Sequence, residues 1–135
     1  MKKVFLDSDI LLDALLKRPK FDLPALNLLA LANQSDIIAI TSSIAFMNVH
    51  YFLNKYDRQR KMQLLKTLRS IIRIMEIGED EIDMAFNSNF SDFEDAVQYC
   101  CAVHARADVI ITRNLEDYKH SNLPVMTAEQ FLKTL

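Results

Sequence analysis

The sequence predicts an α/β fold, in the form of a three-layer α/β/α sandwich around a mostly parallel central sheet. Short apolar runs alternate along the chain with longer segments of helical periodicity, which is the pattern of helices that cross between parallel strands. The run at residues 109–112 is continuously β-branched, as expected of a strand that is buried on both faces. The 135 residues contain no linker, repeat or low-complexity segment, so we expect a single domain over residues 1–135.

Short apolar segments predict the strands of this sheet. They lie at residues 4–6, 37–40, 74–77, 109–112 and 124–126. The first ends at a polar turn that begins with Asp7, the third has a weak pattern, and the last is expected at an edge of the sheet.

Helix-start signals and the spacing of apolar residues predict the segments between the strands. Pro24 opens one helix, residues 41–43 offer caps for another, and Thr127 begins a capping box. We expect helices at residues 10–16, from 24 to the pair 33–34, from the caps at 41–43 through 56, at 57–72, from 79 to about 86, at 92–105, and after Thr127. Met62 follows the apolar spacing of its helix, and residues 114–122 are expected to form a polar loop.

Composition removes several classes of function. A single glycine excludes the glycine-rich loops that bind dinucleotides or nucleoside triphosphates. A net charge of −2 argues against a strongly basic protein that coats nucleic acid, although a local basic patch remains possible. Cys100 and Cys101 are adjacent, which disfavours a structural disulfide. No second Cys/His pair stands at the spacing of zinc ligands, so both cysteines are expected to be reduced. The chain lacks a signal sequence and an 18-residue apolar run, so we expect a cytoplasmic protein without membrane contact.

Acidic and hydroxyl side chains follow the predicted strands. Asp7 and Asp9 come after the first strand, and Thr112 and Asp117 come at the end of the strand at 109–112 and in the loop behind it. Ligand sites in open parallel sheets form beyond the carboxyl ends of the strands, so these side chains are expected to converge if the two strands are neighbours.

A further set of acids opens the helix before that last long strand. Asp92 and Asp95 are three residues apart and share a helix face, whereas Glu94 is expected to point away from it. Several carboxylates in one place disfavour their own ionisation, and Mg²⁺ or Mn²⁺ would resolve the repulsion. Each acid alone also has an ordinary structural explanation, as a strand-end turn residue or as a charge favoured at a helix start.

Four stretches carry a resemblance to a known family. They are Val4-Phe-Leu-Asp-Ser-Asp-Ile-Leu-Leu-Asp13, Ile40-Thr-Ser-Ser-Ile-Ala-Phe-Met-Asn-Val-His-Tyr51, Asp92-Phe-Glu-Asp-Ala-Val-Gln-Tyr99 and Ile110-Ile-Thr-Arg-Asn-Leu-Glu-Asp-Tyr118. Their order and spacing resemble a PIN domain over essentially the whole chain. The last two stretches are the most specific part. The resemblance implies a PIN-like fold and a metal-dependent ribonuclease, and many single-domain bacterial members are the toxin half of a toxin–antitoxin pair.

The resemblance also implies roles for individual residues. By position, Asp7, Asp95 and Asp117 would hold the metal, and Asp92 would complete the catalytic set. Asp9 and Thr112 would support the site, and Asn114 is the other position at which the last acid of the family can fall.

One position departs from the family pattern. Asn48 stands where the family usually has a Glu early in the helix after the second strand. An amide cannot act as a general base and removes one charge from the site. Asp92 or Glu94 would then compensate; the alternative is a catalytically weak PIN fold that serves as an RNA- or protein-binding module. A receiver-like phosphatase is disfavoured, because two long helices follow residue 42 with no strand between them.

Partners follow from the same resemblance. Arg113 and Lys119 flank the acids and are expected to contact RNA phosphates, while the basic helix at 57–72 is either a solvated surface or a phosphate-tracking one. The resemblance implies an RNA substrate, a possible cognate antitoxin and a homodimer. Met47 and Tyr51 lie on a helix that often makes dimer or antitoxin contacts in this family.

Overall fold

A parallel sheet forms the centre of the molecule in the computed structural model, which describes residues 1–135. Its strands run in the order β3-β2-β1-β4-β5, and every neighbouring pair is parallel. The strands are β1 (Lys3–Leu6), β2 (Ile38–Ser42), β3 (Arg73–Met75), β4 (Val109–Ile111) and β5 (Val125–Met126). The first strand in sequence is therefore central, and the predicted α/β class with a parallel sheet is confirmed.

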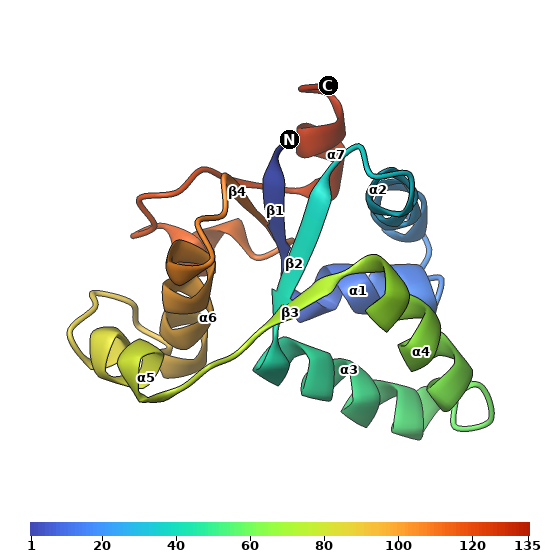
Figure 1. Ribbon diagram of the computed structural model, residues 1–135, viewed down its shortest axis with the longest axis horizontal. Helices are drawn as coiled ribbons and strands as arrows, with labels where there is room; N and C mark the ends of the chain where they lie inside the picture. The colour runs from blue at the N-terminus through green and yellow to red at the C-terminus, as the bar shows by residue number, and fades with distance from the viewer.

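Helices cover both faces of this sheet. They are α1 (Ser8–Leu15), α2 (Asp22–Asn33), α3 (Ser43–Tyr56), α4 (Lys61–Ile71), α5 (Glu79–Phe86), α6 (Phe93–His104) and α7 (Ala128–Leu132), with a 3-10 helix η1 (Leu115–Tyr118). Figure 1 shows α1 to α4 on one side of the sheet and α5 and α6 on the other, which gives the three predicted layers. None of the helices has the length and apolarity needed to cross a lipid bilayer.

Alternate residues of β1 enter the two cores. Val4 and Leu6 are buried in the larger core, with residues of α1, α2, α3, α4 and α7. Phe5 is buried on the opposite face, against α6 and Tyr118. Successive side chains of a strand point to opposite faces, so one short apolar run supplies both cores.

Two predicted segments differ from the structure. The helix expected from residue 57 begins at Lys61, because Asp57 caps the end of α3 and its carboxylate accepts hydrogen bonds from Arg60 at 2.6 and 2.9 Å. Met62, in the first turn of α4, is exposed, whereas Leu65 and Leu68 of the same expected apolar spacing are buried. The expected polar loop contains η1, because Tyr118 is buried and anchors it.

Strand register brings the ends of β1 and β4 together. Leu6 pairs with Ile111, and the backbone N–H of Asp7 donates to the Ile111 carbonyl at 3.0 Å. The residues that follow these two strands therefore start from neighbouring positions at the carboxyl edge of the sheet.

Candidate active site

Asp7 is held at the end of β1 by three donors. It is the N-cap of α1, and one carboxylate oxygen accepts from the Ser8 backbone N–H at 2.8 Å. The other oxygen accepts from Thr112 Oγ1 at 3.0 Å and from the Tyr118 hydroxyl at 3.4 Å. Burial nevertheless raises the pKa of Asp7 above its usual value, against the opposite effect of these hydrogen bonds. The hydrogen bonds thus fix the orientation of the carboxylate, while burial keeps most water away from it.

Asp9 lies two residues after Asp7, in the first turn of α1. Its Oδ2 accepts from the backbone N–H of Arg113 at 3.1 Å, while its Oδ1 is buried without any hydrogen-bond partner. Burial, followed by the charge of Asp7, raises the pKa of Asp9 to about 6. A buried carboxylate oxygen without a donor is costly, so this atom is one that a bound cation or its water would satisfy.

Asp95 brings the start of α6 to the same place. Asp92 is the N-cap of this helix, and its Oδ1 accepts from the Asp95 backbone N–H at 2.9 Å. The pKa of Asp95 is raised to about 7, mainly by burial and then by the negative charges of Asp92, Asp117 and Asp7. These charges belong to Asp7 after β1, Asp117 in η1 and Asp92 before α6, so the predicted acids lie near one another in space.

The loop after β4 supplies the supporting residues. Thr112 is fully buried; besides donating to Asp7, its Oγ1 accepts from the Asn114 backbone N–H at 3.1 Å. Asn114 and Asp117 are both exposed at the rim, and of the two it is Asp117 that adds negative charge at Asp95. The structure thus brings Thr112 to an acid, as the sequence predicted.

One expectation about orientation is wrong. Glu94 does not point away from the acids: its Oε1 accepts from Asn48 Nδ2 at 3.1 Å, and its charge raises the pKa of both Asp7 and Asp95. The guanidinium of Arg113 pairs with Asp13 through two hydrogen bonds of 2.8 and 2.9 Å, so an RNA phosphate would share it with that carboxylate. Lys119 is exposed and pairs with Glu116 at 3.2 Å.

Sequence reasoning missed Asp13 and Tyr118. Asp13 is 1% exposed and carries the ion pair with Arg113, with Arg18 at 3.4 Å as a second cation. The signal was a lone acid within an apolar helical run, four residues after Asp9. For Tyr118 the signal was an aromatic residue in an otherwise polar segment, which commonly anchors a loop to a core.

The donor set suits a hard divalent cation. All its members offer oxygen, the ligand that Mg²⁺ and Mn²⁺ prefer, and Asp9 Oδ1 is left unpartnered. No group of three or more His, Cys, Asp or Glu side chains is gathered closely enough to hold a metal ion as the side chains stand. Mg²⁺ usually retains several waters and takes few carboxylates, so an open set of this kind fits it.

A family model described as PIN domain matches residues 3–116. The chain belongs to the PIN domain family. It is 30% identical over 138 residues to Ribonuclease VapC1 of Aquifex aeolicus (strain VF5), covering 96% of this chain and 93% of the relative. A chain in a toxin-antitoxin complex from Klebsiella pneumoniae has the same fold, with a TM-score of 0.70 and 23% identity over 93% of this chain and 97% of that chain. A chain in the structure of VapBC2 from Rickettsia felis, bound to a DNA fragment from their promoter, gives a TM-score of 0.67 and 18% identity over 92% of this chain and 96% of that chain.

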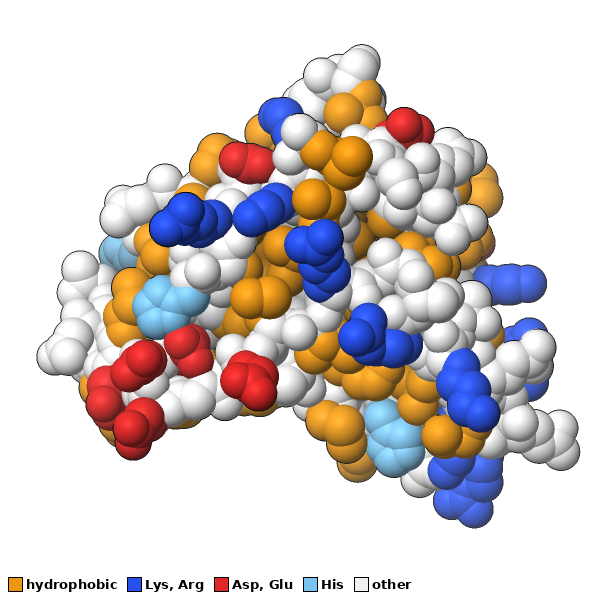
Figure 2. All heavy atoms as spheres, viewed as in Figure 1, with side chains coloured by type: hydrophobic (Ala, Val, Ile, Leu, Met, Phe, Trp, Pro, Cys, Tyr) orange, Lys and Arg blue, Asp and Glu red, His pale blue; other side chains and the backbone are white.

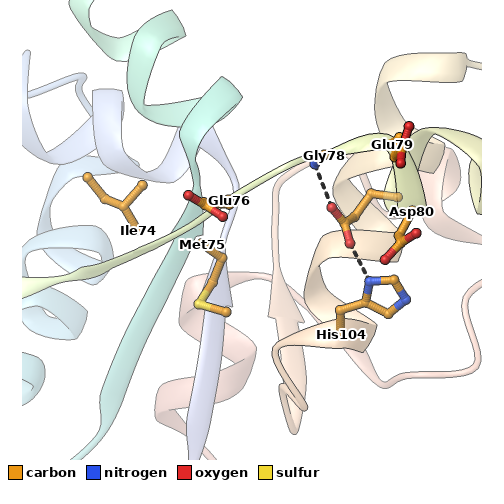
Figure 3. A pocket seen from close by; sticks show the side chains of 8 residues that line it. Ile74, Met75, Glu76, Gly78, Glu79, Asp80 and His104 are labelled. Carbon is orange, nitrogen blue, oxygen red and sulfur yellow. Dashed lines mark hydrogen bonds and ion pairs between the residues drawn. The ribbon is translucent and has the colours of Figure 1, made fainter.

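A second group of acidic side chains lies away from Asp7, Asp9 and Asp95. It lines a pocket of about 530 Å³ beside β3 and the start of α5. Figure 2 shows acidic side chains gathered there around a histidine. Glu81 Oε1 accepts from the Gly78 backbone N–H at 2.6 Å and its other oxygen contacts His104 Nδ1; dashed lines lead from the labelled Gly78 and His104 to this carboxylate in Figure 3. These contacts lower the pKa of Glu81, opposite to the effect at Asp95. Local partners therefore already satisfy Glu81, and the convergent acids remain the candidate active site.

Proposed function

We propose that this PIN domain is a divalent-metal-dependent ribonuclease that cleaves RNA phosphodiester bonds and is the toxin-like component of a toxin–antitoxin pair. The observation that carries the proposal is geometric: Asp7 and Asp9 lie against Thr112 and Arg113 at the carboxyl edge of the sheet, and Asp9 Oδ1 is buried with no hydrogen-bond partner. The raised pKa of Asp95 supports it, because burial and the charges of Asp92, Asp117 and Asp7 cause that rise. The name of the relative, Ribonuclease VapC1, agrees with RNA as the substrate.

In this proposal Asp7, Asp95 and Asp117 hold Mg²⁺ or Mn²⁺, and Asp92 completes the catalytic set. Asp9 braces the site. When bound, the metal would neutralise charge on the phosphodiester and lower the pKa of an attacking water.

The chain's own residues prepare this site. Ser8 N–H and Thr112 Oγ1 each hold a different oxygen of Asp7, so the direction of its carboxylate is set without a ligand. Asn114 donates to Thr112 and thereby fixes the acceptor side of the same hydroxyl. Lys119, together with the exposed Lys66 and Arg69 of α4, offers cations to the RNA backbone. Such contacts position RNA without reading its sequence.

Cleavage of a labelled RNA with Mn²⁺ tests the proposal. We expect Asp7→Asn and Asp95→Asn each to reduce the rate by about 100-fold or more, since each removes a charge from the metal set. Asp80→Asn, an exposed acid of α5, is the matched control and should cleave like the wild type. EDTA should abolish cleavage.

Two results would reject this function. One is a wild type that is as inert as Asp95→Asn and binds no Mn²⁺ by calorimetry. The other is tight RNA binding without cleavage that EDTA leaves unchanged, which would establish the RNA-binding module instead.

An antitoxin and a second copy of the chain are the proposed protein partners. The similar folds occur in complexes that are named toxin-antitoxin and VapBC2. Met47 and Tyr51 are four residues apart on α3 and are 59% and 62% exposed, which leaves an apolar pair for an interface. Phe52, on the same helix, packs partly against the core instead.

Expression in a bacterial host tests the toxin role, and solution mass tests the dimer. We expect wild-type expression to arrest growth and Asp7→Asn to relieve the arrest at equal protein level. Light scattering should give a dimer that Met47→Glu weakens. Unimpaired growth with active enzyme present would reject the toxin role, and a monomeric wild type would reject the homodimer.

A further inference from the structure

Asn48 and Glu94 join two helices at the candidate active site. Asn48 Nδ2, on α3, donates to Glu94 Oε1, on α6, at 3.1 Å across 46 residues of sequence. Asn48 is partly buried and Glu94 is exposed. An amide that donates to a carboxylate restricts the rotamers of that carboxylate, because a charge-assisted hydrogen bond is stronger than a neutral one.

A buried hydrogen bond joins the start of α3 to α6, behind the contact between Asn48 and Glu94. Ser42 is the N-cap of α3, and its Oγ accepts from the Ala45 backbone N–H at 2.9 Å. The same hydroxyl donates to Gln98 Oε1, and both Ser42 and Gln98 are buried. Gln98 lies four residues after Glu94, so the two share a face of α6. The position of Glu94 opposite Asn48 is therefore set by the packed interior.

Glu94 lies beside the acids of the site. It directly precedes Asp95 in the first turn of α6, whose N-cap is Asp92. A carboxylate at position 48 would face Glu94 with the same charge, whereas the Asn48 amide attracts it. The residue that departs from the family pattern and the extra acid of α6 thus form one arrangement.

We propose that Glu94 supplies the metal-site carboxylate that position 48 lacks, and that Asn48 is the positioning residue that aims it. The inference rests on the proposed metal-dependent function. The negative charge that the family pattern places on α3, at position 48, would then lie on α6, at Glu94. The number of negative charges around the metal would be the same as in that pattern. The alternative explanation is that Glu94, in the first turn of α6, only stabilises the helix through its interaction with the helix dipole.

Exchange of the two side chains separates these explanations. Mn²⁺ affinity by calorimetry, and the rise of the melting temperature on adding Mn²⁺, are measured for wild type, Glu94→Gln and the double variant Asn48→Glu/Glu94→Gln. We expect Glu94→Gln to weaken Mn²⁺ binding by about 10-fold or more. The double variant should recover affinity to within about 3-fold of wild type, since a Gln amide then donates to a Glu carboxylate across the same gap. Glu79→Gln, an exposed first-turn acid of α5, is the matched control and should bind like wild type.

Asp95→Asn keeps this inference distinguishable from the proposed function. If Asp95→Asn loses Mn²⁺ binding while Glu94→Gln matches Glu79→Gln, the role of Glu94 is overturned and the metal site stands. If neither variant alters the affinity, the metal site itself is overturned. If Glu94→Gln loses affinity and a folded double variant does not regain it, the exchange of the carboxylate between positions 48 and 94 is overturned. If a folded Asn48→Ala binds Mn²⁺ like wild type, the positioning role of Asn48 is overturned.

Discussion

Arg113 and Asp13 form an ion pair that ties the end of β4 to α1. Arg113 Nε and Nη2 donate to the two oxygens of Asp13 at 2.8 and 2.9 Å, and the guanidinium lies 4.1 Å from the centre of the Phe21 ring. The backbone N–H of Arg113 also donates to Asp9. One residue therefore neutralises a buried acid with its side chain and orients a site acid with its backbone.

Loss of the Arg113 side chain should destabilise the fold. Arg113→Leu leaves the carboxylate of Asp13, which is 1% exposed, with only the longer contact to Arg18. An uncompensated buried charge costs about 3–5 kcal/mol, so urea denaturation should show a loss of that order. Arg18→Leu is the matched control, and we expect it to lose no more than about 1 kcal/mol. Equal losses in the two variants would contradict the assignment of Arg113 as the main partner.

The stability of the metal-free protein should fall as the pH rises toward 7. The ordinary pKa of an Asp side chain is 3.8, and the pKa of Asp95 in the folded chain is about 7. Between these two pH values the folded state therefore binds more protons than the unfolded state. Raising the pH through this window therefore lowers the free energy of unfolding. Asp9 acts in the same direction up to about pH 6. Thermal melts in EDTA from pH 4.5 to 8 should record the fall.

Asp95→Asn should remove most of that pH dependence. Its amide has no proton to lose, so at pH 8 we expect the variant to exceed wild type. Because Asp95 is partly exposed and screened by solvent, the gain should be about 1–3 kcal/mol, which is a rise of about 3–10 °C in melting temperature. The two proteins should converge near pH 4. Asp80→Asn should keep the wild-type profile. A variant that melts below wild type at pH 8 would show that Asp95 is not strained by its neighbours.

The buried hydroxyl of Thr112 should matter more than the volume of its side chain. Thr112→Val keeps the shape but removes the donor to Asp7 and the acceptor of the Asn114 N–H. We expect a loss of about 1–3 kcal/mol in urea melts and weaker Mn²⁺ binding, because a buried polar partner is left unsatisfied. Thr112→Ser retains the hydroxyl and should keep the Mn²⁺ affinity. Equal affinities in the Val and Ser variants would reject the role of the hydroxyl.

The parts of the site that follow strand ends could be predicted, because periodicity locates the strands and parallel strands end at one edge. Asp7 and Thr112 converge for that reason. The direction of Glu94 could not be predicted, since it depends on how α6 is rotated against α3, and the Ser42–Gln98 contact that sets this rotation spans 56 residues. The ion pair of Asp13 was hidden for a similar reason: its partner is 100 residues away.

Tyr118 should act on the site mainly by packing. Its hydroxyl lies 3.4 Å from Asp7 Oδ2, a long contact, while its ring is 2% exposed and packs edge-on to Phe90. Burial and the charges of Asp7 and Asp95 hold the pKa of Tyr118 far above its usual value, so the hydroxyl stays protonated. We expect Tyr118→Phe to cost no more than about 1 kcal/mol and to keep Mn²⁺ affinity. Tyr118→Ala should cost about 3–5 kcal/mol, because it leaves a cavity beneath η1 and frees Asp117 from its place. Urea melts and Mn²⁺ titrations of both variants check this, and a Phe variant as damaged as the Ala variant would assign the effect to the hydroxyl.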